Sequence, residues 1–172
     1  MKQNAYCYSW NMASHSIREI ALTDASWIYE SCQDEQIQYW TTIPRPYLLD
    51  HAESFVKGEF PEYKIWTIED ENLQPVGVIS IHSVNEAKVA DIGYWVSPWG
   101  RGKGATKEAL RLVENYAKND PNIKALSACI SDLNAVSRKI VESVGFKWVE
   151  VADHTCPAGT CQTSSSIFLK VI

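Results

Sequence analysis

The sequence lacks the features that mark membrane proteins, secreted proteins and nucleic-acid-binding proteins. Its 172 residues contain no uninterrupted apolar run of about 18 residues, the length that a membrane-spanning helix needs. The first residues, Met1 to Ser14, lack the apolar segment of a secretory signal peptide. Basic residues are also scarce, because 16 Lys and Arg stand against 21 Asp and Glu, for a net charge of −5. These absences predict a cytoplasmic protein that neither enters a membrane nor binds nucleic acid through a basic patch.

Cysteine is sparse and poorly spaced for cross-links or metal binding. The chain has five cysteines, an odd and scattered set. Cys156 and Cys161 form the one close pair, with a wider gap than the CxxC spacing of zinc and redox motifs, and no second pair completes four ligands. We therefore expect reduced thiols and no bound metal. An acyl-cysteine at Cys129 or Cys156 is disfavoured because neither has an obvious histidine partner in the sequence.

Repeats, low-complexity stretches and long linkers are also absent, so residues 1–172 are expected to form a single domain. Alternating apolar residues predict strands, and apolar residues at helical spacing predict helices. The resulting order of strand, helices, three strands, helix, strand, helix and two strands is typical of a mixed α/β (α+β) domain built around one sheet.

The expected elements follow in chain order. They are a strand at 16–22, a helix from Thr23-Asp24 to Ser31, a Pro-interrupted loop at 43–47, a helix opened by the capping-box spacing of Asp50–Glu53 and running towards Phe60, a meander of strands at 63–69, 75–83 and 88–96, a helix at 105–118, a strand at 125–130, a helix at 134–144 stopped by Gly145, and strands at 147–151 and 166–172.

A glycine-rich turn joins the third meander strand to the helix at 105–118. Its glycines permit a close backbone approach, and the first amides of the helix are unpaired and lie at the positive end of the helix dipole. Such a turn suits a phosphate, and Arg101 and Lys103 add positive charge. The same residues would also suit a tight turn that binds no ligand and leaves the Arg101 and Lys103 side chains in solvent. The spacing fits neither a Walker A loop nor a Rossmann loop, since Gly104 follows Lys103 and Lys107 stands where a third glycine is required.

Three segments together resemble the GNAT superfamily of acetyltransferases. Arg101-Gly-Lys-Gly-Ala-Thr106 is similar to the R/Q-x-x-G-x-G/A pyrophosphate loop, with Thr106 in place of Gly or Ala. Asp132–Phe146 is similar to the N-x-x-S segment that ends in E-x-x-G-F, and Tyr39–Tyr47 followed by Asp50–Phe55 resembles the RimJ/RimL-like ribosomal-protein N-acetyltransferase branch. The resemblance covers most of residues 16–151. It implies the GNAT fold, a mixed and mostly antiparallel sheet flanked by helices, whose splayed central strands bind acyl-CoA.

The same resemblance implies where acetyl-CoA, as co-substrate, would lie. The gap between the strands at 88–96 and 125–130 would hold it, and the main chain at Trp95 and Val96 would pair with the pantetheine arm and supply an oxyanion donor. The side chains of Trp95 and Val96 are expected only to pack. Asn134 is expected either to contact the cofactor or simply to cap its helix. The backbone amides implied to hold the pyrophosphate are those of Arg101, Gly102, Lys103, Gly104, Ala105 and Thr106.

Two side chains are the leading candidates for proton transfer. Many GNAT enzymes protonate the departing thiolate with a tyrosine, but the helix after Asn134 has none, which leaves Ser137 as the proton donor. Asp91 lies on the strand beside the implied thioester and is the first candidate for the general base, unless it is only a solvated strand residue. Asp153 and His154 are the next candidates.

The acceptor remains open at this point. Trp40, Tyr47 and the loop at 43–46 belong to the region that shapes the acceptor site in the family, although they also suit plain packing. Residues 152–165 are expected to form a loop near the acceptor. The predicted function is transfer of acetyl to a protein N-terminal amine or a small amine. The alternative is a GNAT-fold acyl-CoA sensor or scaffold without turnover. A homodimer is compatible with exposed aromatics and a free edge strand.

Overall fold

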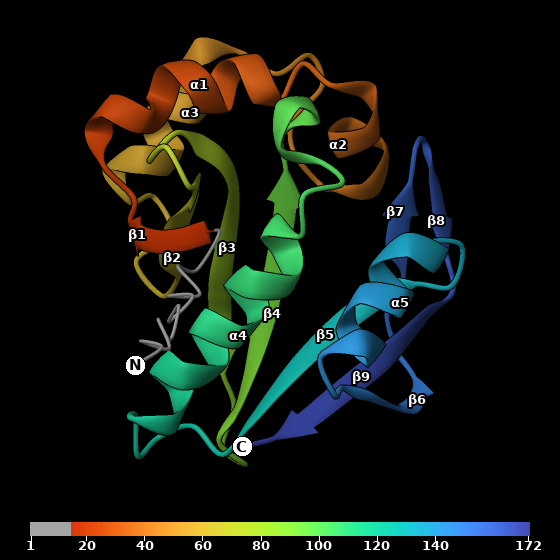
Figure 1. The fold of residues 1–172 in the computed structure, drawn as a ribbon. Helices are drawn as coiled ribbons and strands as arrows, with labels where there is room; N and C mark the ends of the chain where they lie inside the picture. The colour runs from red at the N-terminus through yellow and green to blue at the C-terminus, as the bar shows by residue number, and fades with distance from the viewer. Residues whose placement is uncertain (1–14) are drawn as a thin grey trace, which may run out of the picture.

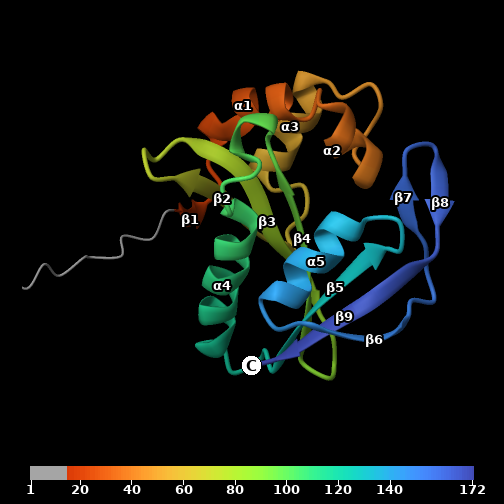
Figure 2. The same ribbon diagram turned by 45° about the vertical axis from the view of Figure 1, so that its right-hand side comes forward.

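The computed structural model describes residues 15–172, which form a seven-stranded sheet with helices on both faces (Figures 1 and 2). The strand order is β1-β2-β3-β4-β5-β9-β6, and every neighbouring pair is antiparallel except β4 and β5. Strands β7 and β8 form a separate hairpin. The strands are β1 (His15–Glu19), β2 (Lys64–Asp70), β3 (Pro75–Val84), β4 (Val89–Val96), β5 (Ala125–Ser131), β6 (Lys147–Val151), β7 (Cys156–Ala158), β8 (Cys161–Thr163) and β9 (Ser165–Val171).

Five helices and two short 3-10 turns connect these strands in the described residues. The elements are η1 (Leu22–Asp24), α1 (Ala25–Ser31), α2 (Glu35–Trp40), α3 (Leu49–Lys57), η2 (Pro98–Gly100), α4 (Ala105–Lys118) and α5 (Ala135–Ser143). Figure 1 shows α1, α2 and α3 gathered at one end of the sheet, with α4 running along β4 and α5 along β5. The mixed, mostly antiparallel sheet flanked by helices confirms the fold class predicted from the sequence.

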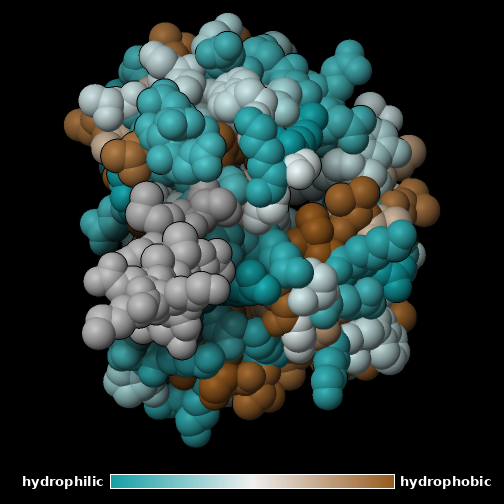
Figure 3. Space-filling model, in the orientation of Figure 1, coloured by the Kyte–Doolittle hydropathy of each residue, from teal (hydrophilic) through white to brown (hydrophobic). Residues whose placement is uncertain are grey.

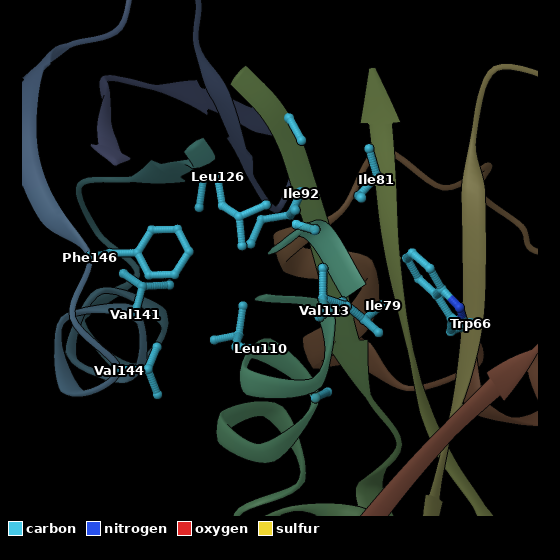
Figure 4. Packing of buried hydrophobic residues seen from close by; sticks show 14 of the residues in the cluster. Trp66, Ile79, Ile81, Ile92, Leu110, Val113, Leu126, Val141, Val144 and Phe146 are labelled. Atoms are coloured by element: carbon cyan, nitrogen blue, oxygen red, sulfur yellow. The ribbon is translucent and has the colours of Figure 1, made fainter. Parts of the chain in front are cut away.

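Two apolar cores follow from the alternation of side chains in β2 and β3. Residues on one face of these strands, such as Trp66 and Ile79, pack with Leu110 and Val113 of α4 (Figure 4). The same core continues to α5 through Val141. Residues on the other face, such as Ile65 and Val78, pack with α1, α2 and α3. The helices therefore hold the sheet from both sides, as a half-buried strand pattern requires.

Some expected elements differ from those in the structure. The capping box at Asp50–Glu53 was wrong, because α3 begins at Leu49 and the Nδ1 atom of His51 accepts the Leu48 amide hydrogen at 3.0 Å. Helix α3 also ends at Lys57, where Gly58 adopts a φ of +85°. Helix α2 was not predicted. Its six residues bury only Ile37, so they carry almost no periodic signal.

Strands β4 and β5 are paired over a short distance only. Their parallel register joins Val89 to Ala125 and Asp91 to Ser127 and then stops, although β4 continues to Val96 and β5 to Ser131. Figure 1 shows the two strands diverging from the lower end of the sheet. The splayed central strands predicted from the sequence are therefore present.

No helix within residues 15–172 has both the length and the apolar character needed to cross a bilayer.

Candidate functional site

A cleft of about 1190 Å³ opens where β4 and β5 part. Its walls come from both strands, from β3, from the first turns of α4 and α5, and from α2, α3 and β7. Figure 3 shows hydrophobic surface over the start of α5, where the exposed residues Leu133 and Val136 line the cleft. The cleft thus has an apolar wall close to its polar strand edges, a combination typical of ligand sites.

The N-terminus of α4 faces this cleft through its backbone. Gly102 and Gly104 have φ angles of +76° and +84°, and a Cβ atom at either position would meet nothing within 4 Å. Gly104 occupies the N-cap position and has no side chain to cap the helix, so the first amides of α4 remain available to an anion. Gly102, Gly104, Ala105 and Thr106 all line the cleft.

The two cationic side chains of this turn, Arg101 and Lys103, lie in different surroundings. The Arg101 guanidinium forms an ion pair with Asp34, the N-cap residue of α2, and also lines the cleft. Burial alone would raise the pKa of Asp34, but the hydrogen bond and charge of Arg101, together with hydrogen bonds from the Ile37 and Gln36 amides, outweigh it and hold that pKa below its usual value. Part of the Arg101 charge is therefore compensated within the protein. The Lys103 side chain is exposed outside the cleft lining.

A pair of hydroxyl groups bridges the opening between β4 and α5. The Tyr94 hydroxyl lies 2.6 Å from Ser137 Oγ, and both residues line the cleft. Burial raises the pKa of Tyr94 to about 12, so its phenol is protonated at neutral pH. The Oδ1 atom of Asn134 accepts the amide hydrogen of Ser137 at 3.0 Å, which caps α5 and fixes Ser137 in its first turn.

On the other face of β4, an imidazole lies over a glycine. His82 is the extra residue where the β3–β4 register shifts between Ile81 and Ser83, and its Nδ1 atom lies 3.5 Å from Oδ2 of Asp91. A Cβ atom at Gly93 would approach His82 Nε2 to 2.7 Å, so only glycine leaves room for the ring. His82 lines the cleft, whereas Asp91 lies behind it. The Asp91 carboxylate therefore contacts a residue that lines the cleft, His82, without lining the cleft itself.

Aromatic rings continue from His82 along one wall of the cleft. His82 stacks on Tyr63 with ring centroids 4.6 Å apart, and Tyr63 stacks on Phe60 at 5.0 Å. Phe55 of α3 extends the row, with its centroid 6.2 Å from that of Phe60. Trp40 and Tyr47 line the same cleft from the N-terminal helices. Such a row gives an elongated, mostly apolar surface next to the imidazole.

The segment after β6 forms the opposite wall. It folds into the β7–β8 hairpin, in which Cys156 and Pro157 line the cleft. Asp153 and His154 pair with each other at 2.9 Å on the exposed side of this segment, outside the cleft lining. Within residues 15–172, no group of three or more His, Cys, Asp or Glu side chains is placed to hold a metal ion.

The structure brings most of the sequence-predicted residues to one place. Trp95, Val96, Asn134 and Ser137 line the cleft together with the glycine turn. His82 and Tyr94 also line it, and the sequence analysis missed both. The sequence held a clue to Tyr94, because Tyr94 is next to Trp95 and the alternation of side chains places it on the face of β4 opposite to Trp95. The sequence held no clue to His82, because only the irregular register of β3 places it against Asp91.

A family model described as "Acetyltransferase (GNAT) domain" matches residues 16–147. The chain belongs to the GNAT acetyltransferase family. A relative, the probable N-acetyltransferase YjcK of Bacillus subtilis, is 29% identical over 104 residues, which are 59% of this chain and 56% of the relative. The match therefore spans just over half the length of that protein.

Two solved structures share the GNAT fold over nearly the whole chain. RimL, the ribosomal L7/L12 alpha-N-protein acetyltransferase in complex with coenzyme A, superposes with a TM-score of 0.83 at 15% identity, covering 94% of this chain and 96% of its own. Spermidine N-acetyltransferase from Vibrio cholerae, in complex with CoA and spermine, superposes with a TM-score of 0.80 at 14% identity, covering 93% and 96%. At these identities the likeness concerns the fold.

Proposed function

We propose that this GNAT chain transfers an acetyl group from acetyl-CoA to an amine by direct attack. The observation that carries the proposal is the separation of β4 from β5 after Asp91 and Ser127, which opens a cleft onto the uncapped N-terminus of α4. The amides from Arg101 to Thr106 would hold the pyrophosphate, and the free edge of β4 at Trp95 and Val96 would meet the pantetheine arm and the thioester carbonyl. Both solved neighbours were crystallised with CoA.

Protons would move at two points of the cleft. An acceptor amine is mostly ammonium at neutral pH and must lose a proton before it attacks. We propose that His82, in place of Asp91, which the sequence suggested as the base, takes this proton directly or through one water, and that Asp91 orients the imidazole and stabilises the imidazolium. On the other side of β4, Ser137 would protonate the departing thiolate. Tyr94 could replace that proton, because its hydroxyl is 2.6 Å away and protonated.

The acceptor that the cleft favours is a single amine at the end of a peptide. Among the described residues that line the cleft, Glu59 is the one carboxylate, while the aromatic row from Phe55 to His82 is extensive. A polyamine would bring several charges and find little compensation there. A peptide would bring one charge and apolar side chains. RimL, by its name, acts on a protein N-terminus, whereas the spermidine enzyme serves as the small-amine comparison.

The deciding experiment measures free thiol released from acetyl-CoA with N-terminal peptides, spermidine and amino acids as acceptors. We expect release that needs an acceptor and is fastest with a peptide. Gly104→Trp should abolish acetyl-CoA binding by calorimetry, because the indole would fill the approach to the α4 amides. Gly58→Trp is the matched control, since Gly58 has a similar φ of +85°, open space around its Cβ position and no place in the cleft.

Other results would redirect the proposal. Acetyl-CoA binding without thiol release for any acceptor would favour the acyl-CoA sensor or scaffold. Faster release with spermidine than with any peptide would make a small amine the acceptor. Equal loss of binding in Gly104→Trp and Gly58→Trp would mean that backbone strain, rather than a blocked phosphate site, explains the defect.

A further inference from the structure

Two thiols meet in a wall of the cleft, away from the groups assigned above. Cys129 is in the middle of β5 and Cys156 is the first residue of β7, and their Sγ atoms are 3.5 Å apart. Both side chains are half-buried and both line the cleft, so a small solute can reach them. The sequence separates them by 27 positions, and only the fold makes them a pair.

Hydrogen bonds on both sides of the hairpin hold Cys156 in this place. Thr163 of β8 binds the Ser131 hydroxyl of β5 at 2.6 Å and donates to the Cys156 carbonyl at 3.1 Å. At the hairpin tip, the amide of Gly159 donates to the Tyr39 carbonyl at 2.8 Å, and Arg45 Nη1 donates to the Gly159 carbonyl at 2.6 Å. The hairpin is therefore fixed to β5 and to the α2 region, which keeps the two sulfurs in contact.

The contact changes the acidity of the two thiols in opposite directions. A hydrogen bond from Cys129 stabilises the Cys156 thiolate and lowers the pKa of Cys156 to about 7, against the opposing charges of Asp91 and Asp132. The same hydrogen bond raises the pKa of Cys129. The pKa of His154, two residues before Cys156, is raised by its hydrogen bond with Asp153. One nucleophilic thiolate and one thiol in contact are the arrangement from which disulfides form.

The geometry allows a bond with little movement. A disulfide has an S–S length of about 2.05 Å, so the sulfurs need to approach by about 1.5 Å from their present 3.5 Å. Side chains alternate along β5, so Cys129 lies on the same face of the strand as Ser127, which pairs with Asp91. The pair therefore faces the His82 side of the cleft, where the proposed acceptor amine would lie.

We propose that Cys129 and Cys156 are a reversible redox site that forms an intramolecular disulfide with a peroxide-class oxidant. The Cys156 thiolate attacks one peroxide oxygen, the O–O bond breaks, and a sulfenic acid forms with release of hydroxide. The Cys129 sulfur then displaces hydroxide from the sulfenic sulfur and loses its proton. The net change for hydrogen peroxide is two thiols and one H₂O₂ to one disulfide and two H₂O, with sulfur oxidised and oxygen reduced.

The test maps thiols in the full-length protein after treatment with stoichiometric hydrogen peroxide and alkylation. Trypsin releases Cys129 in residues 125–138 but leaves Cys156 and Cys161 together in residues 148–170, so the Cys161→Ser variant makes the assignment unique. We expect a peptide pair joined between Cys129 and Cys156, two hydrogens lighter than its parts and separated by dithiothreitol. Cys156→Ser should yield no such pair. Alkylated Cys129 and Cys156, or separate sulfinic acids at these positions, would overturn the proposal.

A second readout concerns the consequence for transfer and rests on the proposed acetyltransferase function. The disulfide fixes β7 to β5 and narrows the acceptor side of the cleft, so oxidised protein should lose thiol release and regain it with dithiothreitol. In the Cys156→Ser variant, peroxide should leave the rate equal to that of the same variant without peroxide. Cross-linking is read by mass, so failure of the acetyltransferase proposal leaves this test intact. A disulfide that leaves the rate unchanged would overturn the effect on transfer alone.

Discussion

In the proposed reaction, the contact between the hydroxyl groups of Tyr94 and Ser137 decides how the departing thiolate receives its proton. A serine hydroxyl is a weak acid, and the thiolate of CoA needs a proton only at the moment it leaves. The phenol of Tyr94 lies 2.6 Å from Ser137 Oγ and is kept protonated by burial, which raises its pKa to about 12. Ser137, the proposed proton donor, thus has a protonated phenol in contact with it, on the strand that is proposed to meet the thioester.

We expect Ser137→Ala to lower kcat about 100-fold, the typical contribution of a positioned proton-transfer group, with little change in acetyl-CoA affinity. Tyr94→Phe should lower kcat in the same direction but less, because Ser137 can still draw a proton from water. Steady-state thiol release together with calorimetry measures both quantities. Tyr116→Phe is the matched control, since that ring packs against Trp66 of β2 and does not line the cleft. Unchanged kcat in Ser137→Ala would remove Ser137 from the mechanism.

Gly93 is the second residue where a small change should have a large effect. A methyl group in Gly93→Ala would overlap the His82 ring, which would have to leave its position over β4 beside Asp91. We expect a loss of kcat with acetyl-CoA binding retained. If His82 is the reason, Gly93→Ala should add little to a His82→Ala protein, which a double-mutant cycle measures. Additive losses would show that Gly93 matters for the strand itself.

At the scale of elements, Asp24 joins β1, η1, α1 and β2 through one buried carboxylate. It accepts hydrogen bonds from Nη1 and Nη2 of Arg18 at 2.8 Å, from the Trp27 indole at 2.8 Å and from the Thr67 hydroxyl at 3.0 Å. Burial alone would raise the pKa of Asp24, but these hydrogen bonds outweigh it and lower the pKa to about 2. Helix α1 is thereby tied to strands β1 and β2 at the edge of the sheet.

We expect the stability contributed by Asp24 to be complete at neutral pH and to be lost in acid. A carboxyl with a lowered folded-state pKa stabilises above its unfolded pKa of about 3.9 and loses that contribution as the pH falls through the folded value of about 2. The contribution is about 2 kcal/mol. Asp24→Asn should lower the free energy of unfolding in urea at pH 7 by about 3 kcal/mol, since it breaks a buried ion pair. Asp153→Asn, fully exposed, is the control and should change it little. Equal effects would refute the role of burial.

The elements also show what a sequence can predict. Helix α4 was predicted from 105 to 118, as observed, from an apolar stripe at Ala109, Leu112, Val113, Tyr116 and Ala117. Of these, Ala109, Val113 and Ala117 are fully buried in the structure, together with Leu110. The glycine turn was singled out because its glycines lie between a strand and a helix, and Ser137 was singled out through the resemblance to the GNAT segments. The His82–Asp91 and Cys129–Cys156 contacts could not be predicted, since a register shift in one case and a hairpin in the other bring the partners together. Such contacts depend on tertiary placement rather than on local pattern.

At the scale of the whole molecule, the core of the C-terminal half depends on β9. Phe168 is fully buried there, packs in the main core and has the Arg138 guanidinium 5.7 Å from its ring centroid. We expect Phe168→Ala to reduce the free energy of unfolding by about 4 kcal/mol, through lost burial and the cavity left behind. Val171→Ala, on the same strand but 76% exposed, should cost less than about 0.5 kcal/mol. Urea denaturation measures both, and similar values would contradict the assignment of β9 to the core.

The strand order has a consequence for synthesis. Strand β9 is the last strand of the chain, yet it lies between β5 and β6, which emerge earlier from the ribosome. The N-terminal strands β1 to β4 can pair as soon as residue 96 has emerged, because each has its partner by then. Strand β5 can pair with β4 only from Val89–Ala125 to Asp91–Ser127, and the rest of β5 and all of β6 have to wait for residues 165–171. We therefore expect nascent chains to carry a formed N-terminal half and a largely unpaired C-terminal half until β9 is free, which makes that interval the one in which the protein most needs protection from aggregation.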